Sequence, residues 1–192
     1  MLALTGIRTK VSGPGLDSLR SQRGAIIVAN HQSLLDIPAM FKHCPPNLSF
    51  IAKKELASIP IFGWAAFIVG TIFIDRAKGA QNESLSDIVR HLQSGLNIFI
   101  FPEGTRSTTG RLAPFKRGAF VFAIQAQAPI VPVTIINSRE RLPKKTWKIS
   151  PGEIEIVVHS PIATTGLSPD HRHDLSAKVH GVIAESLKSR IS

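Results

Sequence analysis

The stretch AIIVANHQSLLD occupies residues 25–36 and joins an unbroken apolar run to a polar turn. A short continuous apolar run is typical of a strand that is covered on both faces of a sheet. Strands are expected at 25–29, 48–52, 71–75, 97–101, 130–136 and 153–158, and residues 7–12 can add an edge strand.

Helices are expected between these strands, over 34–43, 60–68, 81–94, 117–127 and 171–189. The clearest is 81–94, because its apolar residues recur with the helical period. Strands that alternate with helices predict an α/β fold, here a single layered domain over residues 1–192 with a mostly parallel or mixed sheet flanked by helices. Ligands of such sheets bind beyond the carboxyl ends of strands, which singles out the loops after 25–29 and 97–101.

The composition is that of a basic globular chain. Its net charge is +10, which predicts an anionic partner such as nucleic acid, anionic lipid or a phosphorylated substrate. Most Phe residues stand in apolar runs rather than among Lys and Arg, so we expect no base-stacking surface and no nucleic-acid partner. The single cysteine, Cys44, excludes an internal disulfide and fits a reducing compartment.

Residues 57–74 carry no charge, but Pro60, Gly63 and Gly70 interrupt the apolar run. A membrane-spanning helix needs roughly 20 apolar residues. We therefore expect a short helix that can dip into lipid, followed by a buried strand.

His31 and Asp36 stand five positions apart in the polar turn after 25–29. Residues at this spacing do not face each other on a regular helix, so the pair can meet only if His31 lies in the loop and Asp36 in the first helical turn. Ser33 is placed to be the N-cap, and Asp36 then takes the acid position of a capping box. Two interpretations follow: a helix cap beside a loop histidine, or an imidazole fixed by a carboxylate as a general base for an alcohol.

A second polar turn, FPEGTRS, occupies residues 101–107. Gly104 lets the backbone approach a ligand closely, and Arg106 offers a planar fork suited to phosphate. The plainer interpretation is an ordinary turn. No metal site is expected, because HRHD at 171–174 is better interpreted as the polar first turn of a helix.

Four segments, in this order, resemble the motifs of the glycerolipid acyltransferase family: NHQSLLD (30–36), GTIFIDR (70–76), FPEGTRS (101–107) and VPVTI (131–135). AKKEL (52–56) is similar to a recurrent stretch between the first two. The likeness covers about residues 7–136, and within the family it is greatest to the bacterial 1-acylglycerol-3-phosphate acyltransferases.

The resemblance implies transfer of a fatty acyl group from a thioester donor, acyl-CoA or acyl-carrier protein, to the free hydroxyl of lysophosphatidic acid, giving phosphatidic acid with no bound cofactor. His31 would be the general base, and Asp36 would hold its ring. The substrate phosphate would be bound by Glu103, Gly104, Thr105, Arg106, Arg76 and Lys53.

Three alternatives stay open: the same chemistry on another lysolipid, a thioesterase, and a non-catalytic basic module that binds anionic lipid. The resemblance also implies a cytoplasmic protein, peripheral on the inner face of the membrane, at an anionic surface. Family members often carry an N-terminal membrane element, whereas only MLALTG precedes the first expected strand here. Either such an element is missing from this sequence, or docking relies on the apolar segment 57–69 together with basic charge.

Overall fold

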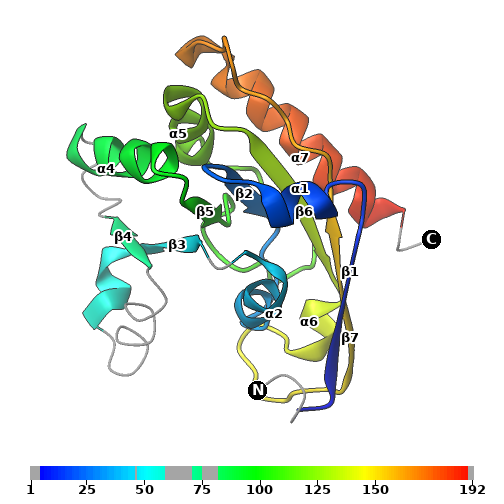
Figure 1. The fold of residues 1–192 in the computed structure, drawn as a ribbon. Coiled ribbons are helices and arrows are strands. Elements are labelled where there is room, and N and C mark those ends of the chain that lie inside the picture. Colours follow the sequence, from blue (N-terminus) through cyan, green and yellow to red (C-terminus); the bar gives the residue numbers. More distant parts are fainter. Residues whose placement is uncertain (1–4, 46, 59–70, 75–81, 190–192) are drawn as a thin grey trace.

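The computed structural model describes residues 5–45, 47–58, 71–74 and 82–189 (Figure 1). Its strands are β1 (Ile7–Ser12), β2 (Ile26–Ala29), β3 (Leu48–Lys53), β4 (Ile72–Ile74), β5 (Asn97–Ile100), β6 (Ile130–Ile136) and β7 (Gly152–Val158). Its α-helices are α1 (Leu16–Ser21), α2 (Asp36–His43), α4 (Asn82–Gln93), α5 (Gly118–Ala126), α6 (Ser138–Arg141) and α7 (Arg172–Lys188). Two 3₁₀ turns, η2 (Lys54–Ser58) and η3 (Pro169–His171), complete the described elements.

The described strands form one seven-stranded sheet in the order β1-β7-β6-β2-β5-β3-β4. From β6 to β4, all neighbours are parallel. The exception is β7, which pairs antiparallel with β6 and parallel with β1. The predicted α/β class with a mixed sheet flanked by helices is therefore confirmed.

Helices cover both faces of this sheet. On one face, α1 and α2 bury Leu19, Ala39 and Met40 against the odd-numbered positions of β2 and β6. On the other, α4, α5 and α7 pack on residues such as Ile26 and Val28. Every residue of β2 is buried. Its continuous apolar run is therefore that of a strand covered on both faces of the sheet, as the sequence predicted.

The helices differ from expectation mainly at their ends. The helix predicted at 34–43 begins at Asp36, and α1 and α6 were not predicted because they are six and four residues long. The predicted helix 60–68 lies outside the described residues. The interpretation of 171–174 is confirmed, since Ser168 and His171 form a capping box ahead of α7.

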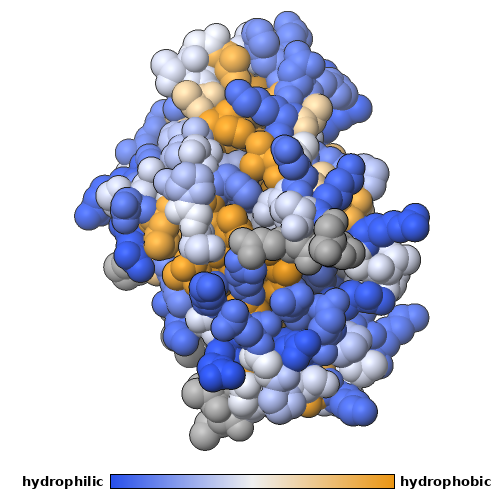
Figure 2. Space-filling view, turned by 90° about the vertical axis from the view of Figure 1, so that its right-hand side faces the viewer, coloured by the Kyte–Doolittle hydropathy of each residue, from blue (hydrophilic) through white to orange (hydrophobic). Residues whose placement is uncertain are grey.

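The outer surface is mixed in character. A view of the side that carries α7 and β1 shows hydrophilic residues over most of the surface, with hydrophobic residues gathered between them (Figure 2). Within the described part of the chain, none of the helices has the length and apolar character needed to cross a membrane.

Candidate active site

The two polar turns meet at one edge of the sheet. Strands β2 and β5 are parallel neighbours, with Ile26 opposite Ile98 and Val28 opposite Ile100, so the loops that leave them emerge side by side. Asn30 fixes the exit from β2: its side-chain amide donates to the carbonyl of Ile135 at 2.8 Å and accepts from the Ile135 N–H at 2.7 Å. The turn therefore starts from a buried, hydrogen-bonded residue.

His31 and Asp36 are in direct contact. His31 Nδ1 lies 2.8 Å from Asp36 Oδ2. The same oxygen accepts the backbone N–H groups of Gln32 and Ser33, each at 2.8 Å. A carboxylate oxygen has no proton to donate, so Nδ1 is assigned as the donor of this hydrogen bond. In the neutral imidazole Nε2 then carries the lone pair.

The turn is built by the residues between this pair. Ser33 Oγ accepts the N–H of Leu35 at 3.2 Å and donates to the carbonyl of Leu142 at 2.8 Å. Asp36 accepts the Ser33 N–H, as a capping-box acid does. The residue that precedes the helix is Leu35 rather than Ser33, so Ser33 is not the N-cap in the expected sense. The Asp36 carboxylate thus makes both the cap-like contact with the Ser33 N–H and the contact that fixes the His31 ring.

The two members of the pair differ in exposure. The Asp36 side chain is fully buried, whereas that of His31 is 14% exposed. Asp36 Oδ1 is buried and has no hydrogen-bond partner among the described residues. The His31 ring stacks on Phe101 at a centroid distance of 3.9 Å. The imidazole is thus held on one side by charge and on one face by an aromatic ring, with part of its surface open.

Glu103 joins the two turns. Its Oε1 accepts the backbone N–H of His31 at 2.7 Å, and its Oε2 accepts that of Ala113 at 3.0 Å. Burial raises the pKa of Glu103 above its usual value, and these two hydrogen bonds offset only part of the rise. Both carboxylate oxygens are occupied by backbone donors, so this side chain holds the turn that carries His31 against the loop that follows β5.

Further hydrogen bonds lock the same two segments. Ser107 N donates to the carbonyl of His31 at 2.8 Å, and Gln32 Nε2 donates to the carbonyl of Gly110 at 3.0 Å. Gly104 has a φ of 74°, a left-handed conformation that glycine adopts without steric cost. These hydrogen bonds, like those of Asn30 and Ala113, could not be predicted from the sequence. Each of them depends on which strands become neighbours in the sheet.

The remaining predicted phosphate-binding residues are less closely grouped. Thr105 is exposed and Arg106 is half-buried. Both contact Lys144, whose Nζ lies 2.7 Å from the Arg106 carbonyl and 3.3 Å from Thr105 Oγ1. Lys53 ends β3, a parallel neighbour of β5, and its side chain is outside the described part of the structure. Arg76 lies outside the described residues.

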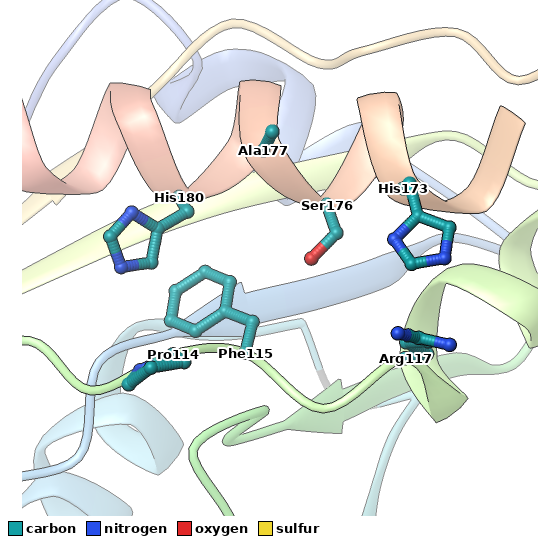
Figure 3. A pocket seen from close by; sticks show the side chains of 7 residues that line it. All are labelled: Pro114, Phe115, Arg117, His173, Ser176, Ala177 and His180. Carbon is teal, nitrogen blue, oxygen red and sulfur yellow. The ribbon is translucent and has the colours of Figure 1, made fainter.

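A separate cleft lies between α7 and residues 114–117, with a volume of about 380 Å³. His173, Ser176 and His180 point from α7 towards Phe115 and Arg117 (Figure 3). None of the residues placed at the His31 site lines this cleft. The two are connected through the backbone, because Lys116 N donates to the carbonyl of Pro102 at 2.8 Å.

The chemistry available at His31 is that of a general base. A neutral imidazole whose Nδ1–H is held by a carboxylate can take a proton at Nε2 from a hydroxyl, and the carboxylate stabilises the imidazolium that forms. The site and its α/β sheet fit the class of proteins that activate an alcohol or a water molecule.

Comparisons with known proteins narrow this class. A family model described as Acyltransferase matches residues 10–136. The human 1-acyl-sn-glycerol-3-phosphate acyltransferase alpha is 36% identical over 178 residues, which cover 92% of this chain and 62% of the relative. The 1-acyl-sn-glycerol-3-phosphate acyltransferase of Saccharomyces cerevisiae is 33% identical, over 98% of this chain and 62% of its own length.

The fold is shared with a solved structure, that of the 1-acyl-sn-glycerophosphate (LPA) acyltransferase PlsC from Thermotoga maritima. The TM-score is 0.80 at 29% identity, with 96% of this chain and 73% of that chain covered. The chain belongs to the acyltransferase family, which confirms the resemblance drawn from the four motifs. It spans about three fifths of the length of the curated relatives it matches.

Proposed function

We propose that this chain transfers a fatty acyl group from a thioester to the free hydroxyl of lysophosphatidic acid, forming phosphatidic acid. One observation carries the proposal: an imidazole is fixed by a buried carboxylate, 2.8 Å away, at the carboxyl ends of two parallel strands. The relatives named above, which act on 1-acyl-sn-glycerol-3-phosphate by name, support the choice of acceptor.

His31 is the general base and Asp36 the residue that orients it. Nε2 takes the proton of the acceptor hydroxyl while that oxygen attacks the thioester carbonyl carbon. The C–S bond then breaks, and the thiolate leaves and takes up the proton held on His31 Nε2, which returns the imidazole to its neutral form. A thiolate is a good leaving group, so the reaction needs neither a strong general acid nor a bound cofactor, and acyl-CoA or acyl-carrier protein can serve as the donor.

Arg106, Thr105 and Gly104 bind the phosphate of the acceptor, with Lys53 and Arg76 as further basic residues. Arg106 stands in a loop that is hydrogen-bonded to His31 through Ser107, so a phosphate held there lies next to the base. Glu103 does not bind the phosphate directly, because its carboxylate would repel an anion. Both of its oxygens already accept hydrogen bonds from backbone N–H groups. Its task is to position the loop.

The acceptor is a membrane lipid, so we place the protein peripherally on the cytoplasmic face of an anionic membrane. The net charge of +10 supports this placement.

The test is a transfer assay with a panel of lysolipids and with both CoA and carrier-protein thioesters. We expect transfer to lysophosphatidic acid and a fall of about 10² to 10⁴ in rate for His31→Ala. His91→Ala is the matched control, because the His91 ring bonds to the carbonyl of Asp87 within its own helix. Hydrolysis of the donor without transfer would favour a thioesterase, and normal turnover of folded His31→Ala would overturn the mechanism.

A further inference from the structure

The segment after α6 displays an exposed tryptophan among lysines. Residues 143–149 read PKKTWKI, which we call the Trp147 loop. Trp147 is 89% exposed and Ile149 is 41% exposed. An indole left almost wholly in water is unusual for a large apolar side chain, and together with Ile149 it forms an exposed apolar site that a partner can cover.

The Trp147 loop is closed at its base. Leu142 is buried, and Ser150 N donates to the carbonyl of Arg141 at 2.8 Å, which joins the two ends. Arg141 Nη1 also donates to the carbonyl of Pro151 at 2.6 Å. The exposed residues therefore project from a fixed base.

The Trp147 loop and the residue before it are hydrogen-bonded to both polar turns of the candidate site. The carbonyl of Leu142 accepts the hydrogen bond of Ser33 Oγ, and Lys144 Nζ donates to the carbonyl of Arg106. The yellow segment that follows α6 can be followed in Figure 1. Leu34, the residue after Ser33, is itself 41% exposed. The Trp147 loop thus borders the site where the lipid acceptor has to arrive.

The chemistry of the loop matches one kind of partner. Lys145 and Lys148 flank Trp147 and are exposed, so the tip offers an indole between two cations. Trp is enriched where a bilayer meets water, because its ring is apolar and its N–H is polar. Lysines near such a surface are attracted by anionic headgroups.

We propose that the Trp147 loop docks this protein on an anionic bilayer, with Trp147 at the boundary between headgroups and acyl chains and with Lys145 and Lys148 on the headgroup phosphates. The inference rests on the proposed function only in that the acceptor comes from a bilayer. Lys144 connects the docked loop to the Arg106 loop, so docking also brings the His31 site close to the lipid surface.

The two tryptophans of the chain allow a direct test. Trp64 lies in the apolar segment 57–69, the rival docking element, and is itself outside the described residues. Trp64→Phe leaves Trp147 as the only indole, and Trp147→Phe leaves Trp64. With vesicles of phosphatidylcholine and phosphatidylglycerol, we expect the emission of Trp147 to shift to the blue and to be quenched by brominated lipid. Unchanged emission of Trp147 on vesicles that bind the protein would overturn the proposal.

A charge variant tests the lysines. Each lysine near an anionic surface contributes about fivefold to partitioning, so Lys145→Gln/Lys148→Gln should weaken vesicle binding about 25-fold. Lys178→Gln/Lys188→Gln removes the same charge from α7 and is the matched control, for which we expect less than a twofold change. Equal losses in the two double variants would show a diffuse effect of net charge and would refute a dedicated loop.

Binding to vesicles requires no turnover, so it is independent of the proposed function. In the transfer assay, Trp147→Ala should lose activity on vesicle-borne acceptor and keep it on a short-chain acceptor dissolved as monomers. Loss on both acceptors would contradict a docking role. Binding of the loop to acidic carrier protein but not to vesicles would likewise overturn it.

Discussion

Replacing Asp36 by Asn removes a buried charge while keeping the size of the side chain. Asp36 Oδ2 accepts three hydrogen bonds, from His31, Gln32 and Ser33, each 2.8 Å long. Two of the donors are backbone N–H groups, so an Asn has to present its amide oxygen at this position. Its NH₂ group then occupies the place of Oδ1, which has no partner among the described residues.

The magnitudes follow from this geometry. Hydrogen bonds to a charged acceptor contribute about 1 kcal/mol more than neutral ones, so three bonds lose roughly 3 kcal/mol. Relief of the desolvation of the carboxylate offsets part of this loss, and we expect a net destabilisation of about 2 kcal/mol. At about 4 Å and an effective dielectric constant of about 20, the lost attraction to the imidazolium is about 4 kcal/mol, or roughly 10³ in rate.

The Asn oxygen still accepts the proton on His31 Nδ1, so the ring keeps its tautomer and the loss in rate reports charge alone. Denaturant unfolding measures the stability, and release of free thiol from the donor measures the rate. Asp170→Asn is the control, because the Asp170 side chain is 96% exposed and such changes cost less than about 0.5 kcal/mol. A variant that is less stable but turns over normally when folded would show that Asp36 only caps the helix.

Three further predictions concern single residues. Arg106→Lys keeps the charge but loses the planar fork, so the KM for lysophosphatidic acid should rise while the donor KM stays constant; the reverse pattern would assign Arg106 to the donor. Because burial raises the pKa of Glu103, the folded state binds its proton at higher pH than the unfolded state does, and stability should gain from this group as pH falls through that raised pKa. Glu103→Gln should abolish this component, and an unchanged pH profile would contradict it. Burial raises the pKa of Cys44 to about 12, so alkylation at pH 8 should be about 10³ slower than in the urea-unfolded chain; equal rates would refute the burial.

The sheet was predictable because its central strands are buried on both faces. Every residue of β2, β5 and β6 is buried, so the apolar runs mark these strands within a residue or so. Helix ends were less predictable. Ser33 looks like an N-cap, but its hydroxyl donates to Leu142, 109 positions away, and α2 begins at Asp36.

The same distinction holds for the candidate site. The contact between His31 and Asp36 spans five positions and needs only a turn, so spacing and turn chemistry predict it. The contact between His31 and Glu103 spans 72 positions and depends on β2 and β5 becoming neighbours. Lys144 is beyond prediction for the same reason, since its partners in the FPEGTRS turn are up to 39 positions away and its loop has no periodic pattern.

The bond between Glu103 and the His31 backbone has a consequence for how the chain folds. Residues 31 and 103 are separated by 72 positions, and the stretch between them supplies α2, β3, η2, β4, α4 and β5. Closing so long a loop costs entropy before any contact repays it, and non-local pairings of this kind form slowly. The base at His31 is therefore assembled only once β2 and β5 have joined at the centre of the sheet. We therefore expect that activity returns during refolding no earlier than the pairing of β2 with β5.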